Sequence, residues 1–217
     1  MLSLLLLHAP QTKLEIKVPV GTVYTYDLAF SMRGPAKIGN VSMKMKLTEK
    51  AAAREGNNTW WNMKFAVISA KGTGEYAKLS DELKSVAKLN LSFLRSPQNQ
   101  LLGSKVNGQA VPSEGNTGTS DVTFPEQPVS VGSTWKSMID LSAKKAAVTY
   151  QFLGSKTWNG KPAYLVSGTI TDKTVKTTSP YRFYIEPKTC KTLYAEGAAQ
   201  VATGGILTDV AFKLKRI

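Results

Sequence analysis

Apolar and polar residues alternate along much of this chain, which is the pattern of half-buried β-strands. The clearest run is VSMKMKLTEK, whose apolar residues share one face while the intervening residues share the other. KLEIKV, at 13–18, and DVAFKLK, at 209–215, repeat the alternation. We expect a strand in each run with these residues turned inward: Val41, Met43, Met45 and Leu47, then Leu14, Ile16 and Val18, then Val210, Phe212 and Leu214.

Short turn sequences separate these runs at spacings of roughly 8–12 residues. They are Gly34-Pro35, Gly56-Asn57-Asn58, Asn107-Gly108, Asn159-Gly160, Ser179-Pro180 and Gly204-Gly205. Strands joined by tight turns at this spacing predict a mainly β fold, with an antiparallel curved sheet or open half-barrel as the architecture.

One segment, GEYAKLSDELKSVAKLN, has a helical rather than an alternating pattern. Its apolar residues Tyr76, Leu79, Leu83 and Val86 fall on one stripe, and charged residues occupy much of the remainder. We expect an amphipathic helix over about residues 75–89, capped by Thr73 and packed on the sheet. A helix that lies on a membrane surface is the alternative.

The second half of the chain resembles the first. PVGTVYTYDL, at 19–28, is similar to SVGSTWKSMIDL, at 130–141, and each is followed by a strand, a polar turn and a further strand. LSFLRSPQNQLLG and RFYIEPKTCKTLYAEG both run from a strand through a proline into a turn and a second strand. We therefore expect one domain, 1–217, with an internal repeat of 13–106 and 122–217 joined by a surface crossover, 107–121.

The chain is strongly basic, with a formal net charge of +13, and lysines outnumber its five arginines. Sequence-specific nucleic-acid recognition relies on the planar guanidinium group of arginine, so we do not expect it. Lysines spread along strands predict a solvated face. An attraction to an anionic surface, polymer or protein partner is the alternative.

The composition excludes several kinds of catalytic site. With one cysteine, Cys190, and one histidine, His8, the usual Ser/His/Asp, Cys/His and zinc sites cannot form within one chain. We expect no metal, no cofactor and no enzymatic activity, and we expect Cys190 to begin the return strand of a hairpin. A carboxylate-dependent hydrolase is the remaining catalytic alternative, with Asp27, Asp140, Glu186 and Glu196 as its candidate groups.

Three stretches carry a resemblance to a known family: VGTVYTYDLAF, FPEQPVSVGSTW and FYIEPKTCKTLYAEG. They resemble uncharacterised bacterial envelope proteins and, more distantly, the periplasmic lipoprotein carriers. The latter resemblance implies an open antiparallel half-barrel whose concave face binds acyl chains under a helical lid, here Glu75 to Leu89. The chain departs from the carriers in its duplication, its single helix and its lack of a partner-docking motif.

The N-terminal segment MLSLLLLHAP has an apolar run, 2–7, that is too short to span a bilayer. Residues 1–9 are interpreted either as a truncated signal segment or as part of a first strand. We expect a periplasmic or secreted protein without a transmembrane segment, and a cytoplasmic location stays open.

The large apolar residues are the best candidates for a binding site. Methionine and aromatic side chains form adaptable walls for apolar ligands, so we expect a lipid-like ligand between sheet and helix, with lysines near an acidic headgroup. An ordinary protein core is the alternative. The candidate wall is Met43, Met45, Trp60, Trp61, Met63, Phe65, Tyr76, Leu79, Leu83 and Val86; ligand identity and oligomeric state stay open.

Overall fold

Strands dominate the part of the chain that this computed structural model describes, which is residues 10–86, 88–112, 116–117, 122–141, 144–172, 175–203 and 205–217. Residues 1–9 lie outside this set, as do 113–115 and 118–121 of the crossover. The elements are β1 (Val23–Arg33), β2 (Asn40–Glu55), β3 (Asn58–Gly72), α1 (Tyr76–Val86), β4 (Leu91–Arg95), β5 (Leu101–Val106), β6 (Gln109–Val111), β7 (Asn116–Thr117), β8 (Thr134–Leu141), β9 (Lys144–Trp158), β10 (Lys161–Thr171), β11 (Val175–Ile185), β12 (Thr192–Thr203) and β13 (Ile206–Arg216).

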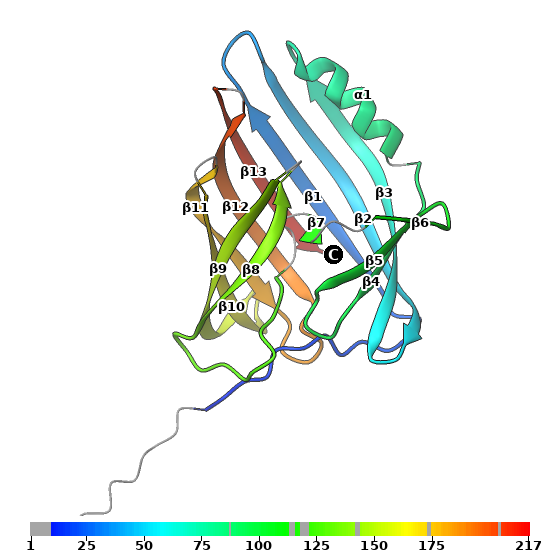
Figure 1. The fold of residues 1–217 in the computed structure, drawn as a ribbon, viewed down its shortest axis with the longest axis vertical. Helices are drawn as coiled ribbons and strands as arrows, with labels where there is room; N and C mark the ends of the chain where they lie inside the picture. The colour runs from blue at the N-terminus through cyan, green and yellow to red at the C-terminus, as the bar shows by residue number, and fades with distance from the viewer. Residues whose placement is uncertain are drawn as a thin grey trace, which may run out of the picture.

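The described strands form one curved, open sheet in the order β6-β5-β4-β3-β2-β1-β13-β12-β11-β10-β9-β8-β7 (Figure 1). Neighbouring strands pair in antiparallel fashion, except that β7 pairs with β8 in parallel. The chain runs outward from β1 to β6, crosses to the other edge at β7 and β8, and returns to β13, which pairs with β1. The predicted mainly β class, a curved antiparallel sheet with one helix, is confirmed.

Alternation gives the sheet two faces of different chemistry. Met43 and Leu47 of β2 lie opposite Phe30 and Tyr26 of β1 and face the hydrophobic core, so we call this the inner face. Lys44 and Lys46 point from the opposite, outer face and are exposed. The two faces predicted for VSMKMKLTEK are therefore confirmed, because the period of a strand places successive side chains on opposite sides.

One end of the sheet, which we call the base, is closed by the segments 10–22 and 122–130 (lower end in Figure 1). Leu14, Ile16 and Val18 are buried there with Phe124 in the same core. The expected strand at 13–18 is wrong, because this segment makes no ladder. Its alternation instead reflects burial of every second side chain as the segment crosses the base.

Two other boundaries differ from the sequence expectation. Ser179-Pro180 lies inside β11 rather than in a turn, at a place where the register with β12 is irregular. Such irregularities are where a sheet tolerates proline. The helix is Tyr76–Val86 rather than 75–89. Thr73 does not cap it, because the first helix amides, of Tyr76 and Ala77, donate to the carbonyls of Ile38 and Gly74. The Thr73 hydroxyl instead accepts a hydrogen bond from the Asn40 amide at 3.0 Å.

The two proline-containing turns share a backbone feature, although the second is one residue longer. Asn99 and Cys190 both have positive φ angles, 65° and 52°, and each donates its amide to a carbonyl earlier in its turn, that of Ser96 or Glu186. Cys190 thus lies inside the turn, two residues before β12, and does not begin the return strand. The internal repeat stays a prediction that this similarity supports.

Candidate functional site

Most of the predicted wall residues share the inner face of β2 and β3. Met45 lies opposite Val67, Leu47 opposite Phe65, and Ala51 opposite Trp61. Met43 and Met63 fall at inner positions of the same register, opposite Ala70 and Glu49. The structure therefore brings together Met43, Met45, Trp61, Met63 and Phe65.

Trp60 is the exception, because adjacent residues of a strand point to opposite faces. On the outer face, its indole Nε1 donates to Glu55 Oε2 at 2.9 Å, and the ammonium group of Lys105 lies 4.3 Å from its ring centroid. The expectation that Trp60 and Trp61 line one wall is wrong for Trp60. Strict alternation within TWWNMKF was the signal that could have separated them.

Helix α1 lies over the inner face at the end of the sheet opposite the base, against β3 and β2 (Figure 1). A Cβ atom on Gly72 would collide with the Tyr76 carbonyl, so glycine allows this close approach. The Tyr76 hydroxyl lies 3.2 Å from that of Thr208 on β13, which ties the helix to the other half of the sheet. The side chains of Leu79, Leu83 and Val86 lie outside what the structure describes.

Burial of the inner face varies along the strands. Towards the base, Tyr26 and Leu47 are almost inaccessible, at 2% and 4% exposure, and Val41 near the helix is likewise buried, at 1%. Large apolar side chains between these ends are only half-buried, and we call them the inner window: Leu28, Met45, Met63, Phe65 and Val67. These residues form the part of the apolar face that another molecule could contact.

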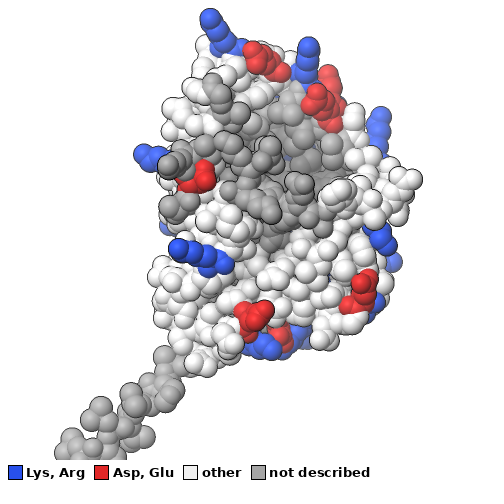
Figure 2. Space-filling view, viewed as in Figure 1, with Lys and Arg blue, Asp and Glu red and all other residues white. Residues whose placement is uncertain are grey.

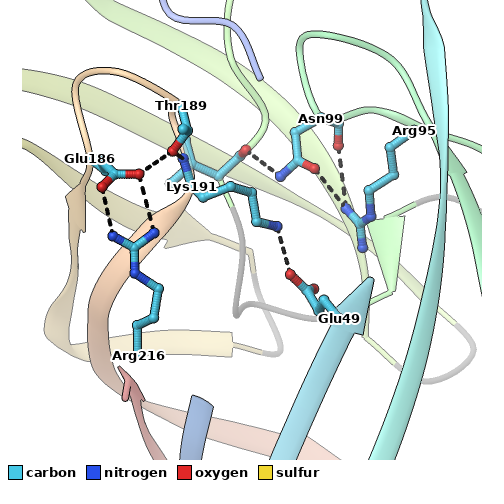
Figure 3. Close-up of polar contacts among 8 residues, drawn as sticks. Glu49, Arg95, Asn99, Glu186, Thr189, Lys191 and Arg216 are labelled. Atoms are coloured by element: carbon cyan, nitrogen blue, oxygen red, sulfur yellow. Dashed lines mark hydrogen bonds and ion pairs between the residues drawn. The ribbon is translucent and has the colours of Figure 1, made fainter. Parts of the chain in front are cut away.

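The base contains charged groups that the hydrophobic pattern did not predict (Figure 3). Lys191 Nζ lies 2.7 Å from Glu49 Oε2, with both side chains at most 6% exposed, and 4.4 Å from the ring centroid of Trp61. Arg95 donates to Asn99, whose amide nitrogen donates to the Val122 carbonyl at 2.9 Å. The signal for Glu49 was its position, because it continues the inward series of Val41 to Leu47.

A second ion pair at the base is partly exposed. Arg216 donates to both carboxylate oxygens of Glu186, at 2.9 and 3.3 Å, and Thr189 donates to Glu186 as well. Partial burial raises the pKa of Glu186, but the hydrogen bonds from Arg216 and Thr189 outweigh it and hold that pKa below its ordinary value of 4.5. The pair fixes the end of β13 against the β11–β12 turn.

The three candidate carboxylates whose side chains are described have separate surroundings. Glu186 is bound to Arg216, Glu196 accepts a hydrogen bond from Tyr194, and Asp27 is exposed on the outer face of β1. The side chain of Asp140 lies outside the described residues. None of the three that are described forms the facing pair that carboxylate-dependent hydrolysis requires. Within the described residues no group of three or more His, Cys, Asp or Glu side chains could hold a metal ion.

Hollows lined by described residues lie on the outer face and at the base. One of about 430 Å³ lies over small side chains of β1 and its neighbours, among them Ala29, Ser31 and Ala211, between Lys44 and Lys213. Another, of about 720 Å³, lies at the base beside Arg54 and Pro97. The ligand cavity expected between sheet and helix stays a prediction that these hollows do not test. No described helix has the length and apolarity needed to cross a membrane.

No protein-family model matches the sequence, and no curated protein matches it. Similar solved structures include lipovitellin, at 13% identity and a TM-score of 0.46. The match covers 93% of this chain and 25% of the lipovitellin chain. A DUF1329 family protein from Desulfovibrio piger is 9% identical with a TM-score of 0.31, over 90% of this chain and 84% of that one. A domain described as an outer membrane lipoprotein-sorting protein, from Vibrio parahaemolyticus, is 10% identical with a TM-score of 0.23, over 88% and 83%.

The similar solved structures thus include an outer membrane lipoprotein-sorting domain, which is the kind of protein that the sequence resemblance named. With identities of 13% or less and TM-scores below 0.5, these similarities assign neither a ligand nor an activity to this chain.

Proposed function

We propose that this protein is a non-catalytic binder of a lipid-like ligand, which lies against the inner window between α1 and the base. The observation that carries the proposal is the group of half-buried apolar side chains on the inner face. A protein of this size normally places such side chains in a closed core, and a surface-accessible group of them marks a site for an apolar partner. An exported, envelope-associated role stays part of the proposal.

The affinity would come from covering apolar surface. Each buried methylene contributes about 0.8 kcal/mol, which corresponds to roughly a fourfold change in Kd. Affinity for a series of saturated chains should therefore rise steeply with length until the chain exceeds the window. Methionine side chains at Met45 and Met63 suit this purpose because they adapt to different ligand shapes.

The test uses a dansyl-labelled undecanoic acid as a fluorescent probe and fatty alcohols of increasing length as competitors. Val67→Glu places a charge in the window, and Ala66→Glu places the same charge on the outer face of the same strand. We expect the first variant to weaken probe binding at least tenfold and the second to leave it unchanged. Met45→Gln with Lys44→Gln repeats the comparison should Val67→Glu not fold, as judged by circular dichroism.

Two results would reject the proposal. One is the absence of saturable probe binding by the native protein. The other is equal weakening by the inner and outer variants, which would mean that the probe does not lie on the inner face. Native mass spectrometry of protein purified from its own cell envelope gives an independent measurement, because it shows whether an apolar molecule accompanies the chain.

A further inference from the structure

A group of aromatic side chains lies on the outer face of β9 to β12, away from both the core and the inner window. Tyr194 of β12 lies opposite Tyr184 of β11, which lies opposite Leu165 of β10. Trp158, at the end of β9, stacks on Tyr194 with a centroid distance of 4.0 Å and an interplanar angle of 15°. These three rings and the neighbouring Leu165 side chain are half-buried, and together we call them the outer aromatic patch.

Cationic side chains surround this patch. In the register of the sheet Lys215 lies opposite Tyr194 and Lys161 lies opposite Trp158. Arg182 is two residues from Tyr184 and Lys156 two residues from Trp158, so both share the outer face. All four cations are exposed. Carboxylates lie among them as well: Glu196 accepts a hydrogen bond from the Tyr194 hydroxyl at 2.7 Å, and Asp27 lies opposite Lys215 in the register of the sheet. Lys161 also interacts electrostatically with Glu186.

The packing of the rings limits what this surface can recognise. Nucleic-acid bases and sugars stack on a free ring face. Here Trp158 and Tyr194 cover one another, and Tyr184 lies 4.8 Å from Trp158 between ring centroids. The parts left for a partner are ring edges and polar tips. Burial and the neighbouring Glu196 raise the pKa of Tyr194 to about 12, so its hydroxyl stays uncharged near neutral pH.

Tryptophan and tyrosine with an apolar body and a polar tip are the residues enriched at the headgroup level of membranes. Lysines beside them complement the negative surface potential of anionic lipids, each contributing about 1 kcal/mol within a Debye length. We propose that the outer aromatic patch docks the protein on bilayers that contain anionic phospholipids. This surface lies on the opposite face from the inner window, so the inference does not depend on the proposed ligand.

The first test measures co-sedimentation of the whole chain with vesicles. One set contains phosphatidylcholine alone, and the other contains in addition about 30% phosphatidylglycerol. We expect binding to the anionic vesicles that weakens from about 0.05 M to about 0.5 M salt, as screening shortens the range of the lysine charges. Equal binding to both sets, or binding to neither, would overturn the proposal.

Variants then locate the contact. Lys161→Glu combined with Lys215→Glu should weaken binding by at least about tenfold, since each lysine corresponds to about fivefold. Lys64→Glu is the matched control, because Lys64 is an exposed lysine on the outer face of β3. For the aromatic group, Trp158→Ala should weaken binding, whereas Trp60→Ala, another half-buried outer-face tryptophan, should not. Controls that weaken binding as much as the patch variants would show that net charge alone is responsible.

Fluorescence quenching by brominated phospholipids tests insertion directly. We expect quenching with the native protein that is largely lost in Trp158→Phe and kept in Trp60→Phe. The patch variants should retain probe binding at the inner window, which separates failure of docking from failure of the ligand proposal. Quenching that does not depend on Trp158 would place the membrane contact elsewhere and reject this surface.

Discussion

The ion pair between Glu49 and Lys191 offers the sharpest test of how the base is held together. Both side chains are buried, and the ammonium group also lies over the ring of Trp61. Replacing Lys191 by methionine keeps much of its volume but leaves the Glu49 carboxylate without its cation. We expect Lys191→Met to destabilise the protein by about 3–5 kcal/mol, the usual cost of an uncompensated buried charge.

The magnitude follows from opposing contributions. At 2.7 Å and an effective dielectric constant near 20, the two charges attract by about 6 kcal/mol. Removing each ion from water costs several kcal/mol, so the pair contributes little net stability compared with apolar side chains of similar volume. Glu49→Met combined with Lys191→Met should therefore lie within about 1 kcal/mol of the native protein, despite the large effect of the single change.

Urea unfolding followed by circular dichroism measures the four proteins of this double-mutant cycle. The control is Lys17→Met, which breaks the ion pair between Lys17 and Glu15 at the surface and should leave the unfolding midpoint unchanged. A cost below about 1 kcal/mol for Lys191→Met would show that water reaches Glu49 and that the base is not closed. A double variant as unstable as the sum of its single changes would contradict the charge-pair explanation.

Three further outcomes follow from the packing at the sheet. Gly197→Ala should lower the free energy of unfolding by about 1–3 kcal/mol, measured by thermal unfolding, because its Cβ would collide with the Tyr181 ring that stacks on Phe212. Gly103→Ala is the control and should have little effect, because its Cβ would make only ordinary contacts at 3.7 and 3.8 Å. Because the pKa of Glu186 is lower in the folded protein, its carboxylate stabilises the fold at pH values above its unfolded pKa near 4.5, and this stabilisation is lost as the pH falls through the folded pKa. In urea unfolding measured across the acid range, the midpoint of Arg216→Gln should therefore fall less steeply with pH than that of the native protein. Burial raises the pKa of Cys190 and leaves it 5% exposed, so a thiol-reactive disulfide reagent should modify it slowly in the folded chain and rapidly after unfolding; fast modification of the folded protein would mean that its turn opens.

The sequence predicted the faces of strands better than their partners. Within VSMKMKLTEK the period of two settles which residues face inward, because that property depends only on neighbours along the chain. The segment 13–18 has the same period without a ladder, since an extended chain crossing a core buries alternate side chains equally well. Pairing depends on what lies alongside, and periodicity does not contain that information.

The buried ion pair at the base shows that the sequence pattern also leaves the partners of charged residues unidentified. Glu49 and Lys191 come from opposite halves of the chain and meet only because β1 pairs with β13. Each lysine in the sequence is compatible with a solvated face, and only the fold distinguishes Lys191, at 2% exposure, from the exposed Lys44 and Lys46. Figure 2 shows other charged side chains at the surface, most of them near the outline of the view.

The segment 13–18, which does not form the expected strand, ties the base together, so the proposed ligand is expected to enter from the α1 end. The Ile16 amide donates to the Pro97 carbonyl at 2.6 Å, and the next amide, of Lys17, donates to the Thr189 carbonyl at 3.2 Å. The backbone amides of two consecutive residues thus bind the proline turns of both halves. The buried ion pair of Glu49 and Lys191 adds to these contacts, because Lys191 directly follows the second turn. Opening the base would break all of these contacts together. At the other end, the described contact between α1 and β13 is the hydroxyl pair of Tyr76 and Thr208, and breaking it costs only about 1 kcal/mol.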